Sequence, residues 1–161
     1  SKRYDPATVF AALDPANASG YAAGTADFLR RWEAAIATWE ERARPLAGKR
    51  VISHHKSWVY LEDWLGLVEV GTLEPVPGIP PTAAHLSSLL AELGTDGQGT
   101  EFIIRAPFHS AKASEWLEER TGIPALALPM TIGGSERAKD LFSWFDDVID
   151  SLLAARSEPR P

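Results

Sequence analysis

Two adjacent histidines, His54 and His55, follow a short apolar run that ends at Ser53. Imidazole is the commonest metal ligand in proteins, and its ordinary pKa lies closer to neutrality than that of other side chains. A metal site or a general base is therefore the chemistry that this pair could perform. The competing interpretation is structural: one ring bonds a backbone carbonyl or caps the following helix, and the other faces water.

Three further side chains with useful chemistry follow other apolar runs. Glu74 opens a proline-rich loop, His109 follows the third run, and Thr131 follows the fourth. The carboxyl ends of parallel strands meet at one edge of a sheet, where open α/β folds bind ligands, so we expect these side chains to lie near the two histidines. Imidazole and carboxylate ligands suit zinc or manganese. Because the chain lacks a compact motif such as HExxH, the site would be assembled from separate loops.

The elements that must position these side chains are four short strands and the helices between them. The strand-like runs cover residues 51–53, 67–73, 102–106 and 125–128, and the helical patterns cover residues 56–65, 82–93, 110–121 and 135–155. Strands that alternate with helices predict right-handed βαβ units, and short, wholly apolar runs predict a parallel sheet covered on both faces. The predicted fold class is α/β, a four-stranded parallel sheet flanked by helices.

One long helical pattern precedes the sheet and runs from Ala16 to Ala47. Its apolar face carries Phe28, Trp32 and Trp39, and a proline and a glycine end it. We divide the chain into an N-terminal helical segment with this long linking helix, an α/β lobe and a tail, at residues 1–47, 48–156 and 157–161.

Other chemistries have weaker support. The sequence Gly133-Gly134-Ser135 before a helical pattern could offer backbone N–H groups to a phosphate, but it lacks the spacing of a P-loop or a GxGxxG motif. A tight turn followed by an N-cap is the preferred interpretation. The sequence contains no GxSxG elbow, the motif that would indicate an α/β-hydrolase. His85 lies in an apolar helix with Thr82 placed as its N-cap, so we expect a structural role for it.

The composition restricts the class of protein. The chain has 161 residues, enough for one domain, and a net charge of −6 without a basic stripe, which argues against nucleic-acid binding. It has no cysteine, which excludes disulfides and thiolate metal sites. No apolar run approaches the length of a membrane-spanning helix. Because the chain begins with Ser1 rather than methionine, we expect it to be part of a longer protein.

A series of motifs along the chain resembles the carboxyl-terminal half of the zinc- and manganese-specific solute-binding proteins of bacterial ABC importers. In order, the motifs are LDPANA at 13–18, VISHHKSWVY at 51–60, EPVPGIPPT at 74–82, TGIP at 121–124 and LPMTIGG at 128–134. The resemblance covers nearly the whole chain. Its most specific parts are the histidine–aromatic–tyrosine block and the Glu-Pro-x-Pro-Gly loop.

The resemblance implies two α/β lobes joined by one long rigid helix, with a metal ion held in the cleft between them. The family ligand lies five residues before a tyrosine, here Tyr60, and this assigns the metal-ligand role to His55. His54, Glu74 and His109 are the secondary candidates. Two further ligands would come from the first lobe. A fourth family ligand, an aspartate near the last strand, has no counterpart between residues 124 and 135.

The implied function is not enzymatic. The family delivers zinc or manganese to the membrane permease of an ABC importer, and its members are periplasmic or anchored to the cell surface by lipid. We also expect self-association of this lobe through uncovered apolar residues of the long helix, with Phe28, Trp32 and Trp39 as the leading site. Two alternatives remain: a stand-alone flavodoxin-like α/β enzyme or regulatory domain with His54 or His55 as general base, and a structural or interaction fragment without a ligand.

Overall fold

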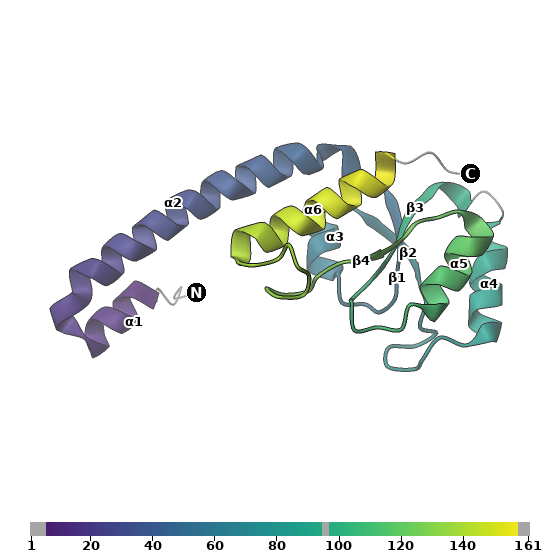
Figure 1. Cartoon of the computed structure of the whole chain (residues 1–161), viewed down its shortest axis with the longest axis horizontal. Coiled ribbons are helices and arrows are strands. Elements are labelled where there is room, and N and C mark those ends of the chain that lie inside the picture. Colours follow the sequence, from purple (N-terminus) through teal and green to yellow (C-terminus); the bar gives the residue numbers. More distant parts are fainter. Residues whose placement is uncertain (1–5, 95–96, 158–161) are drawn as a thin grey trace. The chain divides into compact units, whose positions relative to one another are not determined.

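The computed structural model describes residues 6–94 and 97–157 (Figure 1). The helices are α1 Pro6–Leu13, α2 Ala18–Ala43, α3 Val59–Leu65, α4 Ala83–Leu93, α5 Lys112–Thr121 and α6 Leu141–Ser157. The strands are β1 Arg50–Ser53, β2 Val68–Thr72, β3 Thr100–Arg105 and β4 Ala125–Ala127. Short 3-10 turns flank α2 at Pro15–Asn17 and Arg44–Leu46, and a third precedes β3 at Gly97–Gly99. Within the described ranges, no helix has the length and apolar character needed to cross a membrane.

Backbone contacts divide the chain into two compact units, with the boundary inside α2 between Thr38 and Trp39. The first unit contains α1 and most of α2. Asp14 stabilises the turn between these two helices. Its carboxylate accepts hydrogen bonds from the Asn17 amide at 2.8 Å and from the Tyr21 hydroxyl at 2.9 Å. These two bonds hold the pKa of Asp14 below its usual value. The division predicted at residue 47 and the tail predicted at 157–161 stay predictions. Residues 158–161 lie outside the described residues.

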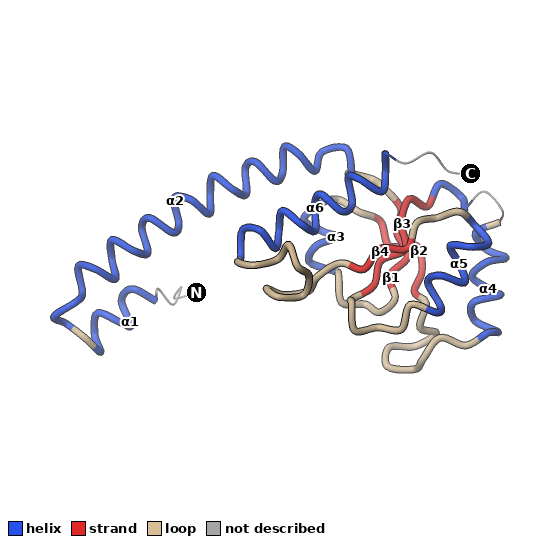
Figure 2. The backbone as a smooth tube through the Cα atoms, viewed as in Figure 1, coloured by secondary structure: helices blue, strands red, loops and turns tan. Residues whose placement is uncertain are grey.

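The second unit is built on a four-stranded sheet with the order β2-β1-β3-β4, in which every strand pairs in parallel (Figure 2). The central strand β1 pairs Arg50 with Val68 of β2 on one side and with Thr100 of β3 on the other. The predicted α/β class with a four-stranded parallel sheet is confirmed. The long helix is also confirmed, as α2 and its flanking turns.

Helices cover both faces of the sheet (Figure 1). On one face, β1 and β3 pack against α4 and α5 through a buried cluster formed by Ile52, Leu73, Leu86, Leu89, Leu93, Ile103, Leu117 and Ile123. Successive strand residues point to opposite faces, so the fully buried Val51 and Phe102 belong to the other face, where α6 contacts β3 and β4. Gly71 of β2 permits a close approach, because a Cβ atom there would lie 2.9 Å from Leu89 Cδ1.

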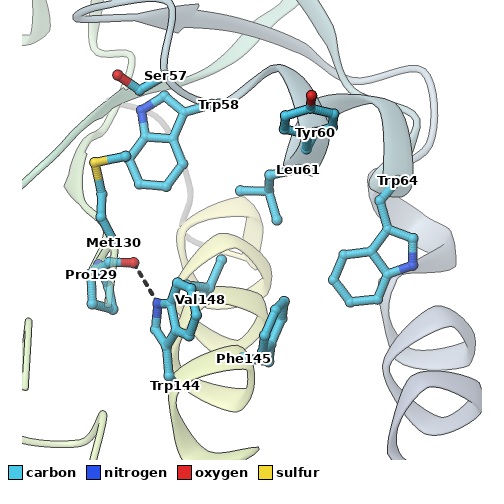
Figure 3. Close-up of a pocket in the computed structure, with 10 residues that line it drawn as sticks. All are labelled: Ser57, Trp58, Tyr60, Leu61, Trp64, Pro129, Met130, Trp144, Phe145 and Val148. Carbon is cyan, nitrogen blue, oxygen red and sulfur yellow. Dashed lines mark hydrogen bonds between the residues drawn. The ribbon is translucent and has the colours of Figure 1, made fainter. Parts of the chain in front are cut away.

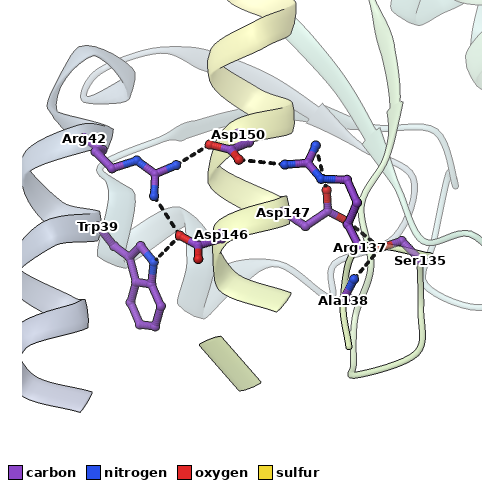
Figure 4. A network of polar contacts seen from close by, with 8 residues as sticks. All are labelled: Trp39, Arg42, Ser135, Arg137, Ala138, Asp146, Asp147 and Asp150. Atoms are coloured by element: carbon purple, nitrogen blue, oxygen red, sulfur yellow. Dashed lines mark hydrogen bonds and ion pairs between the residues drawn. The ribbon is translucent and has the colours of Figure 1, made fainter. Parts of the chain in front are cut away.

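A ladder of arginines and aspartates joins α6 to the end of α2 and to the loop before α6 (Figure 4). Arg42 pairs with Asp146 at 2.7 Å and also with Asp150, and Trp39 Nε1 donates to Asp146 at 2.9 Å. From the other side, Arg137 pairs with Asp150 at 2.7 Å. Trp39 is buried, so its expected role in an uncovered apolar surface is wrong. The rings of Trp64, Phe142 and Phe145 lie against it.

The last helix begins later than its sequence pattern predicts, at Leu141 rather than at residue 135. Ser135 matches an N-cap in sequence, but its hydroxyl donates to the buried Asp147. Asp140 is the residue that caps the helix, because its carboxylate accepts from the Ser143 backbone N–H at 2.8 Å. The same Ser135 oxygen accepts from the Ala138 N–H at 3.1 Å, so Ser135 closes a turn that precedes α6 and does not cap the helix itself.

Candidate metal centre

The histidines lie at the point where the order of strands in the sheet reverses. The chain passes from β1 to β2 on one side, whereas β3 and β4 lie on the other side, and such a switch point opens a crevice beyond the carboxyl ends of the strands. His54 extends β1 by donating its backbone N–H to Ile104 of β3 at 2.8 Å. Below it, the fully buried Ser53 hydroxyl donates to Glu62 of α3 at 2.8 Å. The backbone that presents the histidines is thus fixed by both the sheet and α3.

His55 forms the shortest polar contact among the candidate residues. Its Nδ1 atom lies 2.6 Å from Oε2 of Glu74, and the same oxygen accepts from the Gly78 backbone N–H at 2.8 Å. The bond from His55 is the main reason that the pKa of Glu74 lies below its usual value, so Glu74 is ionised. Because a carboxylate only accepts, Nδ1 carries the proton and the Nε2 lone pair is left for a metal ion. The imidazole is partly exposed, as a ligand at a crevice must be.

His54 and His109 lie beside this pair. Their rings stack with centroids 4.3 Å apart and planes 15° apart, and the His109 centroid lies 6.3 Å from that of His55. Burial lowers the pKa of both His54 and His109, and their mutual proximity further lowers that of His54. Both rings are therefore neutral at neutral pH, which is the form that ligates metals. The residue His54 is only 4% exposed, and its Nδ1 has no hydrogen-bond partner among the described residues.

The remaining candidates do not join the cluster. His85 Nε2 donates to the Thr72 carbonyl at 2.8 Å, which fits the structural role expected for it. Thr131 is exposed in the loop after β4, and its carbonyl accepts from the Gly134 N–H at 3.0 Å. The Gly133 N–H is also bonded within this loop, to the Ala138 carbonyl at 2.6 Å. These amides are occupied, so the loop is a tight turn and not a phosphate site.

The imidazole and carboxylate groups present suit zinc or manganese, but they form only part of a coordination sphere. Within residues 6–94 and 97–157, no group of three or more histidine, aspartate or glutamate side chains is arranged to hold a metal ion alone. Three or four protein ligands are usual for zinc. The cluster of His54, His55, Glu74 and His109 can therefore supply one or two ligands and the groups that orient them.

An apolar pocket of about 400 Å³, which the sequence analysis did not predict, lies between α3 and α6 (Figure 3). Trp58, Leu61 and Trp64 line it from the α3 side, while Trp144 and Phe145 line it from α6. The helical spacing of these aromatic residues was the available signal, but spacing alone predicts core packing. The pocket shows that the packing between these two helices is incomplete.

Comparison with known families identifies the chain. The model of the family described as ZnuA, zinc-uptake complex component A, periplasmic, matches residues 7–155. The chain belongs to the ZnuA family. The family suggested by the sequence motifs is thereby confirmed, and the alternative of a flavodoxin-like enzyme is not favoured. No curated protein matches this ZnuA-family chain.

Solved structures of ZnuA-type proteins share the fold. A crystal structure of ZnuA is 26% identical, with a TM-score of 0.74 over 94% of this chain and 53% of that chain. A ZnuA deletion mutant with zinc bound is 23% identical, with a TM-score of 0.67 over 96% of this chain and 55% of that one. The solute-binding protein FpvC from Pseudomonas aeruginosa, in complex with Mn2+, is 21% identical, with a TM-score of 0.65 over 92% and 56%. This chain spans about half the length of these relatives.

Proposed function

We propose that this chain is the carboxyl-terminal lobe of a solute-binding protein that binds zinc or manganese and delivers it to the membrane permease of an ABC importer. The bond between His55 Nδ1 and Glu74 carries the proposal, because it leaves the Nε2 lone pair of a partly exposed imidazole for a metal ion at the switch point of the sheet. Membership of a family described as periplasmic and involved in zinc uptake supports it. In this role the protein is periplasmic or lipid-anchored, and it is not an enzyme.

We assign unequal roles to the four site residues. His55 is the metal ligand, and Glu74 fixes its tautomer and ring orientation as a carboxylate partner outside the coordination sphere. His109 is the second candidate ligand, because its half-buried ring lies 6.3 Å from that of His55. Its Nδ1 accepts only a long bond from the Ala106 N–H, at 3.4 Å, and Nε2 could ligate a metal once the ring proton moves to Nδ1 and this bond is given up. His54 is the weakest candidate as a ligand, because its ring is buried.

The missing ligands would come from a second lobe that closes over this edge of the sheet. The loops after the strands and the first turn of α3 carry exposed apolar side chains that a second lobe would cover. They include Tyr60 of α3 at 91% and Phe108 at 75% exposure, with Val76 and Ile132 about half exposed. Exposed apolar groups gathered around a polar site are typical of a surface that binds another protein or lobe. In the chain alone, the same surface favours self-association.

Calorimetric titration of zinc and of manganese into the chain and two histidine variants tests the proposal. We expect weak zinc binding that a chelator readily competes, a clear loss in His55→Ala, and unchanged binding in the control His85→Ala, whose ring bonds a backbone carbonyl. Equal loss in both variants, or no loss in His55→Ala, would contradict the assignment.

A further inference from the structure

Glu74, the first residue of the proline-rich loop, is held by hydrogen bonds from three directions. Its backbone N–H donates to the His54 carbonyl at 3.2 Å, and its own carbonyl accepts from the Thr72 hydroxyl at 2.8 Å. These two bonds fix the backbone of Glu74. Its Oε2 atom accepts from the Gly78 backbone N–H at 2.8 Å, beside the bond to His55 Nδ1. The Gly78 N–H therefore fixes the carboxylate that His55 meets.

The direction of this N–H is set by a β-turn at residues 76–79, which the Ile79 N–H closes by donating to the Val76 carbonyl at 2.9 Å. Pro77 and Gly78 are the central residues of the turn, and Gly78 has a φ of +84°. Because proline fixes its own φ near about −65°, a positive φ at the second central residue makes the turn type II. Types I and II differ in the orientation of the peptide between the central residues, and that peptide carries the Gly78 N–H. The sign of φ at Gly78 thus decides whether the N–H meets Glu74.

We propose that Gly78 is a positioning residue of the metal site, whose N–H orients the Glu74 carboxylate so that His55 keeps its proton on Nδ1 and its Nε2 lone pair for the metal ion. This role rests on the proposed function, in which His55 is a ligand. Gly78 itself does not touch the metal and acts through Glu74. The carboxylate partner of a ligating histidine sets its tautomer and ring orientation, and loss of such a partner lowers metal affinity by about 10- to 100-fold.

No neighbouring group in the loop can easily replace this donor. Four of the seven residues from 75 to 81 are prolines, which have no backbone N–H, and the Ile79 N–H is used in the turn. The side chain of Glu74 is only 12% exposed, so loss of the donor leaves a mostly buried carboxylate with one partner fewer. Without the Gly78 N–H the carboxylate is free to rotate, and the proton of His55 can move to Nε2.

Substitution at position 78 tests backbone conformation without a steric clash, because a Cβ atom there would have no heavy atom within 4 Å apart from its chain neighbours. Asparagine tolerates a positive φ, alanine does so less well, and valine is the least compatible of the three. Gly48 is a matched control: its φ is +77°, a Cβ atom there also meets open space, and it precedes β1 at the end of the strand opposite the histidines.

Long-range ¹H–¹⁵N NMR of the imidazole nitrogens in metal-free protein identifies the tautomer of His55 at about pH 8, above the ordinary pKa of imidazole. We expect the Nδ1–H tautomer in the wild type, in Gly78→Asn and in Gly48→Ala. Gly78→Ala should give a mixture of tautomers, and Gly78→Val a larger change. In a Glu74→Ala background, Gly78→Ala should have no further effect, because it acts through Glu74. Calorimetry should show zinc affinity lowered about three- to tenfold by Gly78→Ala and less than about twofold by Gly48→Ala.

Two results would overturn the proposal: an unchanged Nδ1–H tautomer in both Gly78→Ala and Gly78→Val, and an equal change in Gly78→Ala and Gly48→Ala. The tautomer is measured without metal, so this proposal and the proposed function fail separately. A changed tautomer in a protein that does not bind zinc would support the role of Gly78 in orienting His55 and contradict the proposed function. An unchanged tautomer in variants of a protein that binds zinc through His55 would do the reverse.

Discussion

We predict that the buried pair of Ser53 and Glu62, which lies beneath the histidine cluster, makes the stability of the fold depend on pH. The Ser53 hydroxyl donates to Glu62 at 2.8 Å, Ser53 is fully buried, and Glu62 is 7% exposed. Burial is the main cause that raises the pKa of Glu62 above its usual value. A carboxyl group whose pKa is raised by folding favours the folded state at low pH and costs stability as the pH rises through the folded pKa.

Replacement of this carboxyl group should therefore act differently at the two ends of the pH range. Glu62→Gln keeps the acceptor for Ser53 and removes the buried charge, so its free energy of unfolding relative to wild type should increase from about pH 5 to about pH 8. Ser53→Ala removes the donor and should cost about 1–3 kcal/mol, with the larger cost at the higher pH, where the carboxylate is charged.

Urea denaturation followed by circular dichroism at both pH values measures these effects. Glu115→Gln is the matched control, because Glu115 is exposed on α5, and it should show little pH-dependent change. The reasoning is refuted if the difference between Glu62→Gln and wild type is the same at both pH values, or if Ser53→Ala costs less than about 0.5 kcal/mol at the higher pH.

Three further predictions concern metal binding, the ion pairs of Arg42 with α6, and self-association. In a protein that contains both lobes, His55→Ala should lower zinc affinity strongly and His85→Ala should not, with binding weakened below about pH 6 as imidazole ligands become protonated; calorimetry across that range measures both. Arg42→Ala should destabilise the fold by roughly 1 kcal/mol, less at high salt, because its ion pairs are only partly buried; thermal unfolding at two salt concentrations measures it. Sedimentation of the chain should show concentration-dependent association, reduced in a Tyr60→Ser, Phe108→Ser variant; a strict monomer at all concentrations contradicts it.

The strands could be predicted from the sequence because a parallel sheet covered on both faces needs runs that are apolar throughout. Val51 and Ile52 are both fully buried although they face opposite sides of the sheet. The start of α6 and the burial of Trp39 were harder to predict from the sequence, because both depend on contacts with residues far away in the chain. Ser135 bonds Asp147 instead of capping a helix, and Trp39 is covered by aromatic rings about a hundred residues further along the chain.

The topology of the sheet predicted which side chains of the candidate site lie close together, but it did not predict the contacts that they make with one another. The shared edge of a parallel sheet predicted that His55, Glu74 and His109 would be neighbours. The sequence contained no information on which imidazole nitrogen bonds Glu74 or on the stacking of His54 on His109, because both depend on side-chain rotamers and loop paths. Which residues bind metal stays a prediction.

The strand that carries the histidine pair cannot complete its pairing until much of the chain exists. Arg50 of β1 pairs with Thr100 of β3, and His54 donates its backbone N–H to Ile104. Contacts between residues so far apart form slowly, because the entropy lost in closing the long loop must be offset before they stabilise the chain. During synthesis both histidines therefore emerge well before the strand that orders them. A nascent chain that ends before β3 contains both histidines but not the sheet that positions them, so the proposed metal site would form only after β3 has been made.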